Sequence, residues 1–139
     1  MDHGVIALKL NPDEESDQLV LLWKQKDYTS EVPSLAGIGS RIFMVINGGR
    51  LICIDSKNGK IIFADRLKAP GSYLSSPLYA NGYVYFTSYN GLITVIKPGD
   101  KLNIVTQSHL REKIASSPAA LGKIFYVRTD SALYAFKKP

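Results

Sequence analysis

Apolar and polar residues alternate along short stretches of this chain, and the spacing of an amphipathic helix is nearly absent. Alternation with a period of two predicts β-strands that bury one face. Three stretches show it clearly, and each is followed by a turn and another strand: "RIFMVI" (41–46), "YVYFTS" (83–88) and "KIFYVR" (123–128). They are rich in Ile, Val, Tyr and Phe, which favour strands. The pattern predicts an all-β chain.

The strands recur at a nearly constant interval. Leu51, Leu92 and Leu133 lie 41 residues apart, twice in succession, and Pro77 and Pro118 have the same separation. A fixed period in the forties, built from short strands, is typical of a β-propeller with one blade per period. We therefore predict four-stranded antiparallel blades in which the three leucines hold equivalent places.

The repeats divide the chain into unequal parts. Half a blade is followed by two whole blades and an incomplete one, at residues 4–26, 32–67, 73–108 and 115–138. We predict a single β-propeller segment over residues 1–139, a partial propeller of about three blades. Such a monomer would expose two blade faces and unpaired strand edges. The expected partner is a second copy of the chain, which makes a homo-oligomer, or the missing blades of a longer propeller.

The stretch "CIDSKNGKIIF" (53–63) resembles the docking motif of propeller repeats of the pyrroloquinoline-quinone type. That motif has a small residue, an Asp, a Thr-Gly pair and an aromatic residue. Here those places are taken by Cys53, Asp55, Asn58, Gly59 and Phe63. The likeness extends over nearly the whole chain, and it is closest to the C-terminal part of uncharacterised bacterial propellers of this quinoprotein-like type.

The resemblance implies a structural role for the motif, in which the aromatic side chain packs between neighbouring blades. The first repeat has Trp23 at the aromatic place, after an expanded loop. The third repeat departs from the motif at "VIKPGDKLNIV" (95–105). The repeat superfamily includes quinone-dependent enzymes and the propeller lipoprotein of the bacterial outer-membrane barrel-assembly machinery, so the fold alone does not choose a function.

The residues that hold the quinone in this family have no counterpart here. Quinone-dependent dehydrogenases carry adjacent cysteines, a Trp plane under the cofactor and carboxylates on a calcium ion. This chain has one cysteine, Cys53, which we expect to be a buried strand residue, and one tryptophan. Its only dense acidic cluster is predicted to be a solvated hairpin tip: Asp13, Glu14, Glu15 and Asp17. We therefore expect this chain alone to bind no cofactor and no metal.

No catalytic arrangement is visible in the sequence. His3 and His109 have no Cys or His partner at the spacing of a metal site. A nucleophile would need a positioned base. The candidate serines recur with the repeat, which favours a role in the fold: Ser75, Ser76, Ser116 and Ser117. The alternative is that they line a central channel and bind a polar ligand. We predict no catalytic, cofactor-binding or metal-binding residue, and a chain that is not itself an enzyme.

Two tyrosines in one strand can be interpreted in two ways. Tyr83 and Tyr85 share one face of a strand because successive side chains point to opposite faces. They are expected either to pack between blades or to contact a carbohydrate or peptide at the rim of the propeller.

The chain has a net charge of +5 and a pI near 9.3. Its 17 lysines and arginines are spread along the sequence and form no tract. Lysines in turns and at strand ends keep sheet edges from pairing, so we predict no binding of nucleic acid. The apolar runs are too short to span a membrane.

Three hypotheses for the function remain. The first is a non-catalytic propeller scaffold or binding module for a protein or a glycan. The second is a fragment of a quinone-dependent oxidoreductase whose active centre lies outside this chain, and the third is a polyanion-binding module. The first is favoured because propellers commonly bind through rims and channels. The resemblance implies the periplasm or the cell surface for the parent protein, although the first residues do not form a signal peptide.

Overall fold

The computed structural model describes residues 3–10 and 19–137 of the chain. Within these ranges it contains thirteen β-strands and no helix. The strands form four antiparallel sheets of two, four, four and three strands. In chain order the strands are β1 (Val5–Lys9), β2 (Val20–Gln25), β3 (Ala36–Ile38), β4 (Arg41–Ile46), β5 (Arg50–Asp55), β6 (Ile61–Arg66), β7 (Leu78–Ala80), β8 (Tyr83–Thr87), β9 (Leu92–Ile96), β10 (Ile104–His109), β11 (Ala119–Leu121), β12 (Ile124–Arg128) and β13 (Leu133–Lys137).

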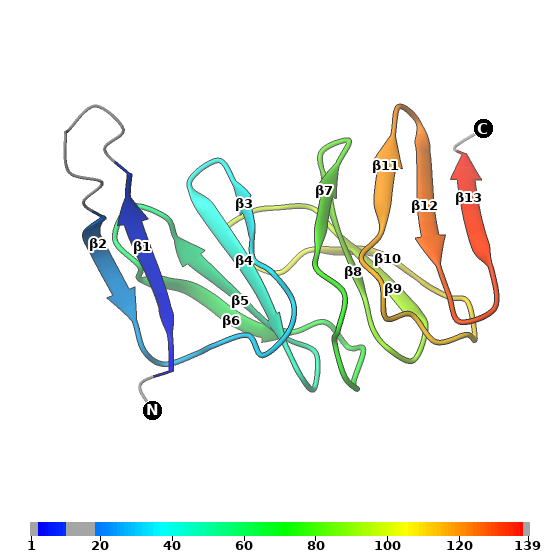
Figure 1. The fold of residues 1–139 in the computed structure, drawn as a ribbon, viewed down its shortest axis with the longest axis horizontal. Helices are drawn as coiled ribbons and strands as arrows, with labels where there is room; N and C mark the ends of the chain where they lie inside the picture. Colours follow the sequence, from blue (N-terminus) through cyan, green and yellow to red (C-terminus); the bar gives the residue numbers. More distant parts are fainter. Residues whose placement is uncertain (1–2, 11–18, 138–139) are drawn as a thin grey trace.

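The four sheets follow one another along the chain and stand side by side in a row (Figure 1). The first sheet is the β1–β2 hairpin. The second and third are meanders in the orders β3-β4-β5-β6 and β7-β8-β9-β10, and the fourth holds β11, β12 and β13. Within each sheet, strands that are neighbours in sequence pair with one another. The prediction of an all-β chain built from four-stranded antiparallel meanders is confirmed.

The repeat leucines are not all equivalent in the sheets. Leu51 pairs across β4–β5 with Val45, and the matching residue of the third sheet is Ile93, which pairs with Thr87. Leu92 is one position out of register and lies on the opposite face of its strand. The predicted equivalence is wrong for Leu92. Leu51 and Leu92 instead pack into the same apolar cluster from two facing sheets.

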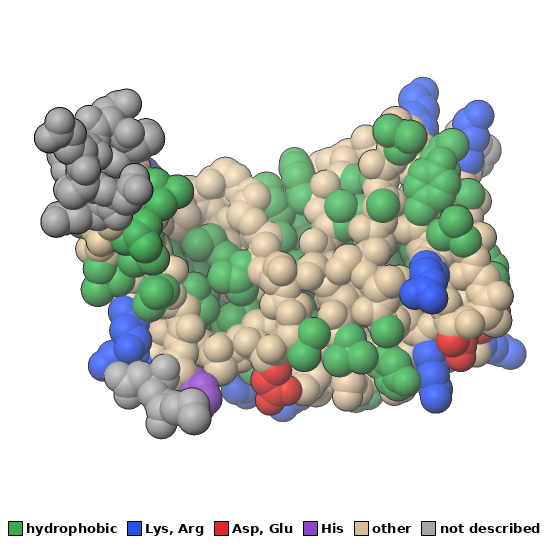
Figure 2. Space-filling view, viewed as in Figure 1, with side chains coloured by type: hydrophobic (Ala, Val, Ile, Leu, Met, Phe, Trp, Pro, Cys, Tyr) green, Lys and Arg blue, Asp and Glu red, His purple; other side chains and the backbone are tan. Residues whose placement is uncertain are grey.

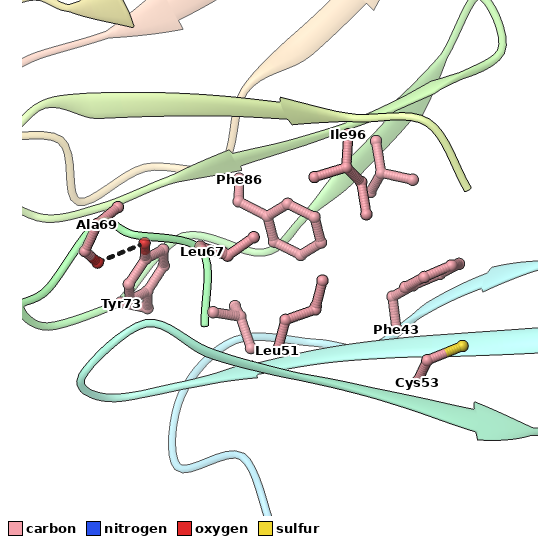
Figure 3. Packing of buried hydrophobic residues seen from close by; sticks show 10 residues of the cluster. Phe43, Leu51, Cys53, Leu67, Ala69, Tyr73, Phe86 and Ile96 are labelled. Carbon is pink, nitrogen blue, oxygen red and sulfur yellow. Dashed lines mark hydrogen bonds between the residues drawn. The ribbon is translucent and has the colours of Figure 1, made fainter. Parts of the chain in front are cut away.

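The largest part of the core lies between the second and third sheets (Figure 3). Phe43, Leu51 and Cys53 of the second sheet face Phe86 and Ile96 of the third, and all five are buried. Burial of an apolar side chain of this size stabilises the fold by about 1.5–3 kcal/mol. One further cluster joins the first sheet to the second, and a smaller one joins the third sheet to the fourth. Cys53 is a buried strand residue, as predicted.

The docking motif determines the shape of the β5–β6 hairpin. The side chains of Asp55 and Asn58 each accept a hydrogen bond from the backbone amide two residues later, at 2.8 and 2.9 Å. Gly59 has a φ of +73°, a value that L residues rarely adopt. A Cβ at this position would lie 2.6 Å from an atom of the Trp23 ring. Only glycine therefore allows the close contact between this turn and the indole.

Trp23 of the first sheet packs against the β5–β6 hairpin. Its Nε1 donates a hydrogen bond to the backbone oxygen of Ser56 at 2.9 Å, and the ring packs in a cluster with Ile52 and Ile54. The side chain is 9% exposed. The aromatic contact between neighbouring blades that the resemblance implies is confirmed for Trp23.

Candidate functional site

A groove of about 820 Å³ lies between the third and fourth sheets, at the end where the β7–β8 and β11–β12 turns lie. Its lining combines aromatic side chains from both sheets with two lysines: Tyr83, Tyr85, Phe125, Phe136, Lys123 and Lys137. Basic and apolar side chains stand next to one another in this part of the surface, near the end of β13 (Figure 2). An apolar concave surface with a few polar groups is typical of a binding site.

The two tyrosines of β8 have different roles. Tyr85 stacks on Phe125 of the fourth sheet, with ring centroids 4.6 Å apart and an interplanar angle of 28°. Burial raises the pKa of Tyr85, and the charge of the neighbouring Tyr83 hydroxyl raises this pKa further. The Tyr85 hydroxyl is therefore protonated at neutral pH. Tyr83 is 37% exposed and faces the groove. Of the two predicted alternatives, packing between sheets applies to Tyr85, whereas contact of Tyr83 with a carbohydrate or peptide stays a prediction.

The matching interface between the second and third sheets is closed. Leu102 and Ile104, from β10 and the segment before it, pack against the cluster there, and so does Phe63. Nε of Arg41 donates a hydrogen bond to Asp100 Oδ1 at 2.8 Å across the same interface. Among the described residues, the fourth sheet has no strand in the place of β10, and the groove is open.

The third sheet has a smaller side chain in the place that Phe63 takes in the second. Phe63 pairs with Cys53 across β5–β6, and the residue in the matching place of the third sheet is Thr106, which pairs with Val95. Thr106 is exposed and is not among the residues that line the groove. The third repeat therefore lacks the aromatic contact that Phe63 makes in the second.

Glu112 holds the fourth sheet from the loop between β10 and β11. Its carboxylate accepts hydrogen bonds from the hydroxyls of Ser131 and Tyr134, both at 2.6 Å, and from the Thr129 hydroxyl. The hydrogen bonds from Ser131, Thr129 and Tyr134 lower the pKa of Glu112. Tyr134 in turn stacks on Phe136, with centroids 5.8 Å apart. Glu112 could not be singled out from the sequence, because one glutamate in a loop gives no signal of its contacts.

Two of the four serines join segments that precede neighbouring sheets. Ser76 Oγ accepts a hydrogen bond from the amide of Ser34, and Ser117 Oγ accepts one from the amide of Ser76, each at 2.9 Å. Ser116 Oγ donates to a backbone oxygen of β12 at 3.1 Å. Ser75 is buried, and its hydroxyl has no partner among the described residues. Three of the four serines singled out in the sequence therefore make contacts that serve the fold.

The other candidate residues are dispersed. His109 Nε2 lies 2.8 Å from the backbone oxygen of Asn90, and His3 is exposed. Burial raises the pKa of Cys53 to about 11, so the thiol stays protonated and inert at neutral pH. The acidic residues predicted to form a hairpin tip, at 13–17, lie outside the described residues. In the part of the chain that is described, no three His, Cys, Asp or Glu residues come together as a metal site.

The described residues form no helix that is long and apolar enough to cross a membrane. No protein-family model matches the chain, and no curated protein matches it. Several solved structures do. The chain is similar to BamB from Moraxella catarrhalis, with a TM-score of 0.76 and 17% identity over 98% of this chain and 40% of BamB.

Two dehydrogenases are similar as well. Quinohemoprotein alcohol dehydrogenase ADHIIG from Pseudomonas putida HK5 has a TM-score of 0.65 and 13% identity over 85% of this chain and 21% of the enzyme. A europium-containing methanol dehydrogenase has a TM-score of 0.54 and 14% identity over 78% of this chain and 23% of the enzyme. The chain has the fold of part of a β-propeller like those of these proteins. It spans less than half the length of each of these proteins, and at such identities the likeness shows the fold alone.

Proposed function

We propose that this chain is a non-catalytic propeller module that binds a segment of another protein in the groove between its third and fourth sheets. The groove itself is the observation that carries the proposal. It is large enough for several side chains, and aromatic residues line both of its walls. Aromatic side chains are the commonest anchors of protein interfaces because they bury much apolar area and lose little conformational freedom.

The lining favours a peptide segment over a glycan. Four aromatic rings and alkyl groups make most of the surface, and the charged groups are the ammonium groups of Lys123 and Lys137. A glycan would require several hydrogen-bonding side chains for its hydroxyls, and of these the groove offers Asn81 beside the two lysines and the tyrosines. Apolar side chains accompanied by a carboxylate match this surface better.

Peptides selected from a random display library on the full chain test the proposal. We expect the selected peptides to lose about tenfold or more in affinity when Tyr83 and Phe136 are both replaced by alanine, because each ring contributes an anchor. The matched control is Tyr79→Ala, since Tyr79 is 49% exposed and lies outside the groove. Equal affinity for all three proteins, or selection of glycans in a parallel array instead of peptides, would contradict the proposal.

Localisation and association belong to the same proposal. The resemblance to quinoprotein-like repeats favours the periplasm or the cell surface for the parent protein. Exposed apolar side chains on β1 and β2, such as Ile6, Leu21 and Leu22, support association through the first sheet. The associating partner is a further copy of the chain or further blades of a longer propeller.

The alternative function is a part of a quinone-dependent oxidoreductase. The similarity to the two dehydrogenases favours it, since the chain matches 21% and 23% of their lengths. The open reading frame around these 139 codons tests it. Adjacent cysteines and a set of Asn, Asp and Glu residues for calcium in additional blades would support the enzyme. Saturable binding of pyrroloquinoline quinone by this chain alone would contradict both functions as proposed.

A further inference from the structure

Four asparagines of the described chain are followed by glycine, each in or beside a turn: Asn47–Gly48, Asn58–Gly59, Asn81–Gly82 and Asn90–Gly91. In such a pair the backbone nitrogen of the glycine can attack the side-chain carbonyl carbon of the asparagine, because glycine has no side chain to obstruct the approach. A hydrogen bond from that nitrogen opposes the attack, since the N–H must first leave its acceptor. The surroundings of the glycine amides therefore decide which pair can react.

Three of the four glycine amides already donate hydrogen bonds to backbone oxygens elsewhere in the chain. They belong to Gly48, Gly59 and Gly91, and the bonds are 2.8–2.9 Å long. The peptide between Asn90 and Gly91 is held at its oxygen as well, which lies 2.8 Å from Nε2 of His109. Turning any of these amides toward the preceding side chain would break a hydrogen bond.

Two of the asparagine side chains are also fixed. Asn47 Nδ2 donates a hydrogen bond to the Glu31 carboxylate at 2.7 Å, and its Oδ1 accepts one from the Tyr73 amide at 2.9 Å. Asn58 Oδ1 accepts a hydrogen bond from the backbone amide of Lys60 at 2.9 Å. These contacts hold the reactive carbon away from the glycine nitrogen.

The pair Asn81–Gly82, in the β7–β8 turn, has none of these constraints. Both residues are exposed, and among the described residues neither the Asn81 side chain nor the Gly82 amide has a hydrogen-bond partner. Their φ values are +51° and +82°, and positive values at both central residues of a two-residue hairpin are those of a type I′ turn. The turn belongs to the third sheet, which packs against a neighbouring sheet on each side (Figure 1).

This turn can bring the reacting atoms together while its strands stay paired. Rotation of the peptide between Asn81 and Gly82 converts a type I′ turn into a type II′ turn, and Ala80 and Tyr83 stay opposite each other in both. The rotation takes ψ of Asn81 to about −120°. At that angle the Gly82 nitrogen lies on the same side of the Cα–C bond as Cβ of Asn81, and so within reach of the side chain.

We propose that Asn81 is a deamidation site, and the first of the four asparagines to react. The Gly82 nitrogen forms a bond to Cγ of Asn81, the Cγ–Nδ2 bond breaks, and Nδ2 leaves as ammonia with the proton of the Gly82 amide. Water then opens the cyclic imide at either carbonyl and yields aspartate or isoaspartate. Both products place a carboxylate in the turn, and isoaspartate also lengthens its backbone by one carbon, which loosens the pairing of β7 with β8. The inference does not depend on the proposed function.

Incubation of the full chain at mildly alkaline pH, with and without urea, tests the site. The tryptic peptide 69–101 contains both Asn81 and Asn90, so fragment-ion mass spectrometry compares these two within one molecule. In the folded chain we expect Asn81 to react about five- to tenfold faster than each of the other three, the factor for one backbone hydrogen bond that must open. In urea the four rates should be similar, because the hydrogen bonds are lost. Equal rates in the folded chain, faster reaction at Asn47 or Asn58, or a preference for Asn81 that persists in urea would overturn the inference.

Hydrogen exchange tests the consequence for the turn. The matched control is Asn81→Asp, which carries the new charge without the added carbon, and Asp-Gly also favours a type I′ turn. We expect the β7 amides to exchange faster in the isoaspartate form than in the unmodified chain, and at the unmodified rate in the control. Equal exchange in all three proteins would contradict the loosening of β7, and faster exchange in the control would assign it to the charge instead of the backbone.

Discussion

The structure has two comparable interfaces, one between the second and third sheets and one between the third and fourth. The sheets face each other in the same way at both, but the first interface is closed and the second is open. In the first, β10 and Phe63 cover a cluster whose central residues are fully buried. In the second, Phe136 is 40% exposed and Tyr83 is 37% exposed, and a groove remains. The comparison teaches that two interfaces with the same strand order can differ in how far their aromatic side chains are covered, because Leu102, Ile104 and Phe63 pack over the first.

The two interfaces differ in how they hold tyrosine. The closed one buries Tyr73, whose hydroxyl donates a hydrogen bond to the backbone oxygen of Ala69 at 2.9 Å. The open one presents Tyr83 and Tyr85, whose rings are apolar and whose hydroxyls tolerate water. A tyrosine at the rim can therefore be exposed in the free protein and buried in a complex.

The largest effect should come from truncation in the closed interface. We expect Phe86→Ala to lower the free energy of unfolding by about 3–5 kcal/mol, because it leaves a cavity in a fully buried cluster. Phe136→Ala in the open interface should cost about 1 kcal/mol, since part of its ring already contacts water. Urea denaturation of both variants measures the difference. Similar losses would show that the fourth sheet is packed as tightly as the third.

A second comparison concerns the contact between the first and second sheets. Gly59→Ala places a methyl group against the Trp23 ring, whereas Gly82→Ala, at a φ of +82°, meets nothing within 4 Å. Both substitutions incur the backbone cost of a positive φ, about 1–2 kcal/mol. We expect Gly59→Ala to cost about 1–3 kcal/mol more, because a packed ring must move. Thermal unfolding monitored by tryptophan fluorescence reports this contact directly, and equal destabilisation would contradict it.

The smallest effect should be local to the fourth sheet. Glu112→Gln should increase amide exchange in the β12–β13 turn, because the amide accepts fewer hydrogen bonds than the carboxylate. Hydrogen bonds lower the pKa of Glu112 in the folded chain, so its charge stabilises the turn above the ordinary glutamate pKa. That contribution is lost as the pH falls through the lowered value. The difference between the two proteins should therefore disappear in acid, and a difference that persists there would reject the carboxylate as its source.

Much of the fold was predictable because strand alternation and turn glycines are local features. The hairpins, the all-β class and the burial of Cys53 follow from residues close together in sequence. The error at Leu92 has a physical cause: a spacing of 41 residues does not reveal which face a side chain takes, and one position reverses the face. The extents predicted for the individual blades stay predictions.

For the candidate site, the sequence left two roles open for its tyrosines: packing between blades or contact with a ligand. Sequence alone placed Tyr83 and Tyr85 on one face, because alternation within a strand is local. It did not separate the buried ring from the exposed one, since that depends on Phe125 of the next sheet and on which strand covers the interface. The contacts of Glu112 with the β12–β13 turn likewise join a loop to a turn about twenty residues away.

The amino-acid sequence by itself determined the strands, their meander order and the glycine turn that Trp23 packs on, because these depend on backbone preferences and on the period of the apolar residues. The tertiary structure alone decided where the core closes and where a groove stays open. Burial depends on which side chains of separate sheets meet, and no local pattern encodes that meeting.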